Sequence, residues 1–254
     1  MTELTALPVV SVAEVAARQA LLVLDARGTA VHASHTTAGQ HLLLQLADDD
    51  VARPFALANP PNDTGLLEFI IKLPEDRMAR VLGLVEGDKL PASTCMGRGF
   101  PFDILRNVDG GADLWLCGVG SGIAPLRAAL EVLVGERQRY GDITLLYGVR
   151  SADELCYRER FAIWAGLGVK VVPVVSRPQQ DQTANQTANQ TANHATSPGA
   201  WQGATGYVQD QLPKSFARPE ATHALVIGLP DMEKAICAAL LERGVGPEHV
   251  HRNW

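Results

Sequence analysis

Residues 113–126, DLWLCGVGSGIAPL, combine a short apolar run, a glycine-rich turn and the start of a helix. Residues 222–235, THALVIGLPDMEKA, repeat this plan about 110 residues later. Two strand–turn–helix units predict one parallel sheet whose loops lie at the same edge, where ligands bind in open α/β sheets. Gly118, Gly120 and Gly122 are expected to leave room for a diphosphate at the backbone. The following helix points free N–H groups and its positive dipole end at that anion.

The composition is that of a soluble globular protein, with 254 residues, 46% hydrophobic and 20% charged. This length is enough for two modest domains. The net charge of −6 argues against nucleic acid as the main partner, because phosphate backbones require a basic face. No apolar run reaches the ~20 residues of a membrane span, and the N-terminus lacks the features of a signal peptide. We therefore expect an intracellular protein, cytoplasmic or organellar.

The cysteines at 95, 117, 156 and 237 form no CxxC pair. A structural zinc or a cysteine-ligated iron–sulfur cluster is therefore not expected, and the sequence favours reduced thiols. His249 and His251 alternate as on one face of a strand, but a metal site needs more ligands than two. We predict no metal site.

The first hundred residues contain short apolar or alternating segments separated by turns, which favour a small antiparallel β-barrel. The expected strands are residues 21–25, 41–46, 54–58, 66–73 and 89–93, with a helix over 76–85.

Beyond residue 110 the pattern changes to strands alternating with helices, which predicts a parallel sheet covered on both faces. The expected strands are 114–117, 143–149, 169–175 and 225–227, and the expected helices are 124–139, 154–165 and 232–243. We predict a β-barrel domain over 1–108 and an α/β domain over 109–254. Residues 181–199 contain QTAN three times in succession and are expected to form a polar surface insertion.

Several motifs in a fixed order support a more specific interpretation. After the predicted barrel come GVGSGIAP (118–125), LYGVR (146–150), VSRP (175–178), GYVQD (206–210) and GLPDM (228–232). This order resembles the ferredoxin–NADP reductase superfamily over nearly the whole chain. The resemblance implies FAD on the barrel and NAD(P)H on the α/β domain, with hydride transfer between the nicotinamide C4 and the flavin N5.

The resemblance also assigns residues to the nicotinamide nucleotide. They are Gly120, Ser121 and Gly122 on the diphosphate and nicotinamide path, Tyr147, Gly148 and Arg150 beside the ribose, Ser176, Arg177 and Tyr207 at the adenosine end, and Gly228 across the cleft. Arg177 and Ser176 can hold a 2′-phosphate, and Tyr207 can stack on adenine, which favours NADPH. NADH-using relatives can also carry Ser-Arg here, so the choice between NADP and NAD stays open.

The flavin-binding residues depart from the family pattern Arg-x-Tyr-Ser/Thr. This chain has RPFA at 53–56, so Arg53 can pair with the FAD diphosphate and Phe55 can lie against the isoalloxazine ring, whereas Ala56 lacks the hydroxyl. At the second flavin contact, N–H groups of a helix start near Met78 and Ala79 are expected to receive a phosphate.

Two further positions bear on the cofactors. Trp254 either stacks on the flavin or its adenine or closes a terminal strand. Ile227 replaces the cysteine that many relatives carry beside the nicotinamide.

Two functions follow from these motifs. The first is an NAD(P)H-dependent flavin oxidoreductase that passes electrons to a separate acceptor, such as a protein or a complex. Hydride transfer requires oriented rings rather than a general base, so no catalytic side chain is assigned. The second is a non-catalytic or regulatory relative with weakened flavin binding, acting as a subunit or partner in a complex. The lost polar contacts predict loss of FAD on purification.

Overall fold

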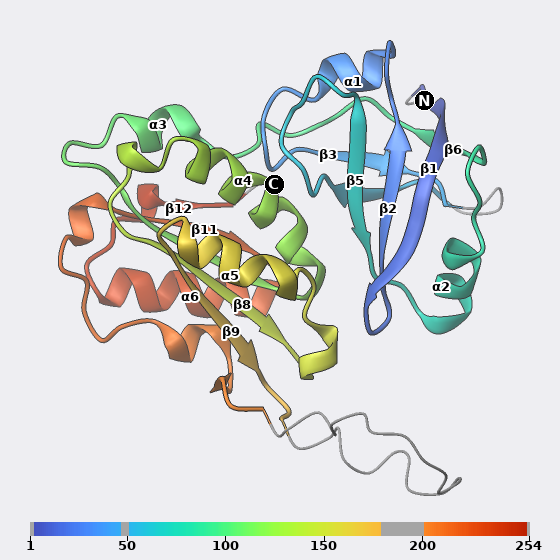
Figure 1. Cartoon of the computed structure of the whole chain (residues 1–254). Coiled ribbons are helices and arrows are strands. Elements are labelled where there is room, and N and C mark those ends of the chain that lie inside the picture. Colours follow the sequence, from blue (N-terminus) through green and yellow to red (C-terminus); the bar gives the residue numbers. More distant parts are fainter. Residues whose placement is uncertain (1–2, 47–50, 179–200, 253–254) are drawn as a thin grey trace, which may run out of the picture.

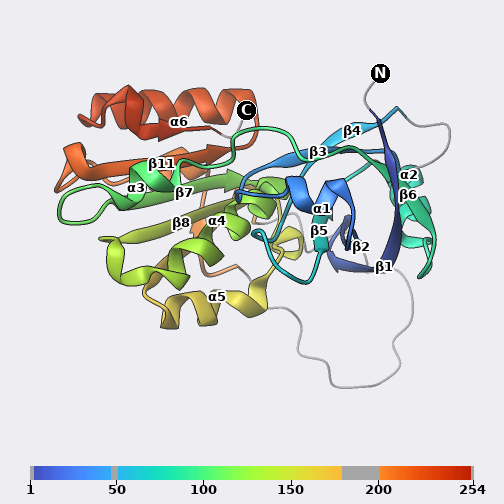
Figure 2. The same ribbon diagram turned by 90° about the horizontal axis from the view of Figure 1, so that it is seen from above.

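The computed structural model describes residues 3–46, 51–178 and 201–252, which form two sheets lying side by side (Figures 1 and 2). The first sheet is antiparallel, with the order β4-β3-β6-β1-β2-β5. Its strands are β1 (Thr5–Ala16), β2 (Gln19–Asp25), β3 (His41–Leu44), β4 (Arg53–Ala56), β5 (Leu66–Ile71) and β6 (Lys89–Ala92).

This sheet curls around a core of buried aliphatic side chains that includes Leu7, Leu22 and Leu42. The edge strands β4 and β5 are linked only loosely, for example by the Ala58 N–H, which donates to the Glu68 carbonyl at 2.7 Å. The predicted antiparallel barrel is therefore confirmed as a half-open barrel. Strand β1 was absent from the sequence prediction, although it pairs with both β2 and β6.

The second sheet is parallel, with the order β10-β9-β8-β7-β11-β12. Its strands are β7 (Asp113–Val119), β8 (Ile143–Val149), β9 (Val169–Val175), β10 (Ala204–Thr205), β11 (Thr222–Ile227) and β12 (Val250–His251). The helices of the chain are α1 (Ala30–Ser34), α2 (Glu75–Leu82), α3 (Phe102–Arg106), α4 (Ile123–Gly135), α5 (Arg158–Gly166) and α6 (Pro230–Glu242).

Figure 2 shows α6 on one face of the parallel sheet and α4 and α5 on the other, as the alternating pattern predicts. The chain starts at the central strand β7, adds β8, β9 and β10 outward on one side, and then returns to place β11 on the other side of β7. Such a reversal opens a crevice at the carboxyl ends of the two central strands. Within the described ranges, no helix is both long and apolar enough to span a bilayer.

One hydrophobic cluster joins the two sheets. It includes Ala58 and Ile70 from the barrel, the connecting residue Phe100, and Leu126 from α4, all of them buried. The barrel and the parallel sheet therefore share apolar packing, which holds the edge of one against the other. The predicted insertion at 181–199 and Trp254 lie outside the described residues.

Candidate functional site

The glycine-rich loop lies at the central edge of the parallel sheet. Strands β7 and β11 pair in parallel so that Ile227 stands opposite Gly118, and β8 places Gly148 opposite Val119. The turns after β7, β8 and β11 therefore meet at one edge, as the repeated strand–turn–helix pattern predicts. This edge is the crevice created by the reversal of strand order.

The three glycines of the loop have different roles. A Cβ at Gly118 would stand 2.6 Å from Leu126 Cδ1, and one at Gly122 would stand 2.9 Å from the Ile227 carbonyl oxygen. Protein atoms therefore fill the side-chain space at these two positions, and a diphosphate contact at the Gly122 backbone stays a prediction. Gly120 differs: its φ is +55°, and the nearest non-neighbouring atom to its Cβ position, among the described residues, is Lys72 Nζ at 4.0 Å.

Helix α4 begins at Ile123, where the sequence predicted a helix start. A 3₁₀ turn over Gly120–Gly122 leads into it, and the Ile123 N–H donates to the Gly120 carbonyl. Ser121 is exposed on this turn. The positive end of the α4 dipole therefore points toward the open backbone at Gly120, an arrangement that favours an anion.

The residues predicted for the ribose and adenosine lie at the ends of β8, β9 and β10. The Arg177 N–H donates to the Arg150 carbonyl at 2.8 Å, and both arginine side chains are exposed. The Ser176 hydroxyl already donates to the Val149 carbonyl at 3.3 Å. Tyr207, which follows β10, is 64% exposed. Two cations and one aromatic ring are thus available to solvent at this end.

Tyr147 does not border the ribose as the resemblance implied. It is completely buried, and its hydroxyl accepts a hydrogen bond from the Cys156 N–H at 3.3 Å. Burial raises its pKa well above the usual value. Every residue of β8 is buried, so alternation along this strand does not distinguish a ligand face from a core face.

Gly228 lies across the edge from Gly118, directly after β11. A Cβ there would stand 2.4 Å from Met232 Cε and 2.7 Å from Val119 Cγ2, so glycine is needed for packing. Its N–H donates to Glu233 Oε1 at 3.2 Å. Gly228 therefore shapes the crevice, while its own backbone donor is already used.

On the barrel, β4 carries the residues predicted to hold the flavin. Arg53 is exposed, and Phe55 is half-buried with part of its ring packed on the barrel core. Ala56 is also half-buried. This strand offers a cation and one aromatic face, but no side-chain hydrogen-bonding group at residue 56.

Helix α2 does not offer the predicted phosphate donors. It begins at Glu75, so the Met78 N–H is inside the helix and donates to the Pro74 carbonyl at 2.8 Å. The Met78 side chain is buried in the barrel core, and Ala79 is exposed. The remaining free donors of the first turn stand beside the carboxylates of Glu75 and Asp76. The Met78 N–H is thus already used within the helix, and the assignment of Met78 and Ala79 to a flavin phosphate stays a prediction.

Ion pairs between the two sheets were missed in the sequence. The Glu154 carboxylate, 2% exposed, receives Lys72 Nζ at 2.5 Å and Arg18 Nη2 at 2.9 Å. A second ion pair has the opposite polarity, with its cation on the α/β side and its carboxylate on the barrel: the buried Arg127 of α4 pairs with Glu68 of β5. These partners are far apart in the chain, so the sequence does not show that they pair. Lys72, a charged residue directly after an apolar strand, was the one local sign of such a contact.

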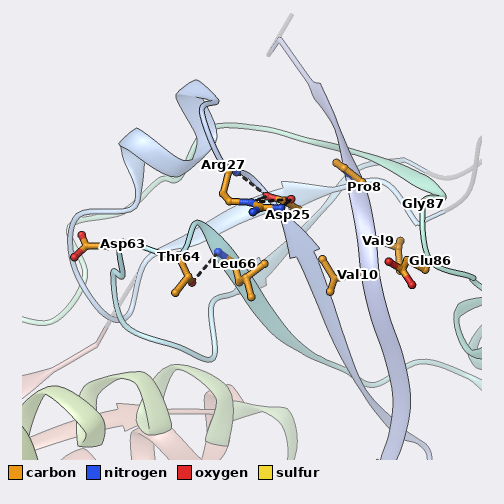
Figure 3. Close-up of a pocket in the computed structure, with 10 residues that line it drawn as sticks. All are labelled: Pro8, Val9, Val10, Asp25, Arg27, Asp63, Thr64, Leu66, Glu86 and Gly87. Atoms are coloured by element: carbon orange, nitrogen blue, oxygen red, sulfur yellow. Dashed lines mark hydrogen bonds and ion pairs between the residues drawn. The ribbon is translucent and has the colours of Figure 1, made fainter.

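A hollow of about 650 Å³ lies elsewhere, on the barrel (Figure 3). Arg27 is bound to Asp25, whose pKa is lowered to about 2, first by the side-chain hydrogen bond from Arg27. Asp63 and Glu86 add further negative charge to the lining. With its one lining arginine already paired, this hollow is unfavourable for a phosphate-bearing ligand.

Comparison with known proteins agrees with this geometry. Residues 116–194 match the family model of the oxidoreductase NAD-binding domain. A ferredoxin NADP⁺ reductase from Neisseria gonorrhoeae, solved with bound FAD and NADP, superposes with a TM-score of 0.71 at 20% identity, covering 99% of this chain and 98% of that one. The chain therefore shares the two-domain fold of this reductase.

Two sequence relatives extend over most of the chain. The fruit protein pKIWI502 of Actinidia deliciosa is 30% identical over 223 residues, which are 84% of this chain and 64% of the relative. The anthranilate 1,2-dioxygenase electron transfer component of Acinetobacter baylyi is 24% identical over 84% of this chain and 56% of its own length. The chain thus spans less than two thirds of the length of either relative.

Proposed function

We propose that the protein is a flavin-linked oxidoreductase that moves electrons between NAD(P)H and a separate acceptor. The observation that carries this proposal is the open backbone at Gly120. It lies beside the Lys72 ammonium and the start of α4, at the sheet edge. A left-handed glycine, a cation and a helix N-terminus together favour a diphosphate.

The nicotinamide nucleotide is proposed to extend from Gly120 and Ser121 toward β10. Arg150, Ser176, Arg177 and Tyr207 are then placed to contact its adenosine half. Because the Ser176 hydroxyl is already bonded to a carbonyl, Arg177 is the stronger candidate for a 2′-phosphate. Replacing Arg177 by Gln should weaken NADPH binding more than NADH binding if the phosphate is recognised there.

FAD is proposed to bind on the barrel near β4, with Arg53 as its cation and Phe55 as its aromatic contact. When bound, FAD accepts the hydride of NAD(P)H and can pass electrons on. The β4 residues fit this group in part, but α2 lacks free donors at Met78 and carries two carboxylates in its first turn. We therefore propose weak flavin retention, with FAD lost during purification.

The acceptor is proposed to be a separate protein. One relative is named as an electron transfer component of an oxygenase, which supports a role as a reductase component. An intracellular location is proposed from the four free cysteines. Two of them, Cys117 and Cys156, have pKa values raised to about 12, mainly by burial, and are inert thiols.

A second candidate function is a non-catalytic subunit that has lost flavin. The two carboxylates in the first turn of α2 favour it, together with Ala56, Ala79 and Ile227, which replace family residues that contact the cofactors. This alternative retains the nucleotide loop but predicts no electron transfer to FAD.

Reconstitution distinguishes the two functions. The purified chain is incubated with excess FAD and mixed anaerobically with NADPH or NADH, while the flavin absorbance band is followed. The oxidoreductase proposal expects the band to bleach faster than in free FAD with the same nucleotide. A band that bleaches no faster than free FAD, whether or not flavin binds to the chain, would support the non-catalytic subunit.

A further inference from the structure

A lysine of the barrel lies against the nucleotide loop of the other sheet. Lys72 follows β5 directly, and its Nζ stands 4.0 Å from the Cβ position of Gly120. The Lys72 side chain is 32% exposed, so solvent and ligands reach it. A diphosphate held at the Gly120 backbone would therefore come within contact of this ammonium.

Lys72 is already bound to a carboxylate. Glu154 lies in the 3₁₀ turn Ala152–Glu154 after β8, and its Oε2 is 2.5 Å from Lys72 Nζ. Its other oxygen receives Arg18 Nη2 at 2.9 Å, and the carboxylate is 2% exposed. One buried negative charge therefore holds two cations, both from the barrel.

Arg18 changes the cost of releasing Lys72. Removing the last cation from a buried carboxylate is strongly unfavourable. With Arg18 in place, Lys72 can turn from Glu154 to an incoming diphosphate while the carboxylate stays paired. The Arg18 side chain is 58% exposed, so it has room to shift its position on Glu154 when Lys72 leaves.

We propose that Glu154 is a positioning residue that competes with the nucleotide diphosphate for Lys72, and that Arg18 makes this exchange possible. The proposal rests on the proposed function, because it requires a nucleotide at Gly120. Glu154 then sets how strongly the nucleotide is held, and the same exchange links nucleotide binding to the ion pairs between the two sheets.

Two substitutions should change affinity in opposite directions. Glu154→Gln frees Lys72 and is expected to tighten ADP-ribose binding about threefold, whereas Arg18→Gln leaves Lys72 as the only cation on Glu154 and is expected to weaken it about threefold. Both effects should shrink as salt screens the charges. Adenosine, which has no diphosphate, should bind all variants equally.

The measurement is titration calorimetry of the full chain with ADP-ribose and with adenosine, at low and high salt. Thermal unfolding checks that each variant is folded, and Arg18→Gln carries the test alone if Glu154→Gln does not fold. Affinities that fall in both variants, or an Arg18→Gln variant that binds ADP-ribose like the wild type, would overturn the competition while leaving the proposed function intact. Wild-type protein that binds no ADP-ribose would overturn both.

Discussion

Substitution of Arg127 by Met should destabilise the chain through the contact between the two sheets. The Arg127 side chain is 5% exposed, and its Nε lies 2.8 Å from Glu131 Oε1. Its Nη1 pairs with Glu68 and donates to the Tyr157 hydroxyl at 3.3 Å. Its guanidinium carbon also lies 4.9 Å from the Tyr157 ring centroid. Methionine keeps the aliphatic packing but removes every polar contact.

The expected magnitude follows from the burial of the partners. Removing one member of a buried ion pair costs about 3–5 kcal/mol. Glu68 and Glu131 are 26% and 23% exposed and keep some access to water, so the lower end, about 3 kcal/mol, is expected. For a chain of this size that loss lowers the melting temperature by about 6–12 °C.

Arg139→Met is the matched control. Arg139 is 55% exposed and lies 3.7 Å from Glu136, so its loss should cost less than about 1 kcal/mol. Both variants are compared with the wild type by thermal and urea unfolding. If Arg127→Met were no less stable than Arg139→Met, the buried pair would not hold the two sheets together.

Three further predictions follow from single positions. Gly122→Ala should destabilise the fold by about 1–3 kcal/mol, because the new Cβ would stand 2.9 Å from the Ile227 carbonyl oxygen. Gly135→Ala, in α4 with open space around the Cβ position, should be neutral or stabilising, and urea unfolding compares the two variants. Burial is the main cause that lowers the His223 pKa from 6.5 to about 4. Between these pH values the unfolded state binds more protons than the folded state, so the free energy of unfolding should fall as the pH drops from 6.5 toward 4. A flat profile of unfolding free energy over this range would refute the prediction. Ala56→Ser should raise the FAD content of purified protein, measured by absorbance; unchanged content would show that the missing hydroxyl is not limiting.

The periodic and glycine-rich segments of the sequence were sufficient for most of the fold. The alternation after residue 110 predicted the parallel sheet and the start of α4, because strands buried on both faces and a turn before a helix leave clear patterns. Strand β1 was missed because its twelve residues include Pro8 and several exposed positions, which weaken the alternation. The division at residue 108 stays a prediction.

The site was less accessible from sequence than the fold. Whether a glycine serves packing or a ligand depends on what stands beside it in space, which spacing alone does not reveal: Gly118 and Gly122 are packed, and Gly120 is open. The same limit applies to the link between Lys72 and Glu154, residues 82 positions apart in the chain. The sequence pattern was enough to locate the glycine-rich loop, whereas the role of each glycine in it depends on its tertiary contacts.

A crystal structure of the chain with FAD and NADPH would test the site most directly. The expected result is the nucleotide diphosphate beside the Gly120 backbone, within reach of Lys72, with the nicotinamide directed toward β4. A nucleotide bound in the acidic hollow near Asp25, or anywhere away from the carboxyl edge of the parallel sheet, would contradict it.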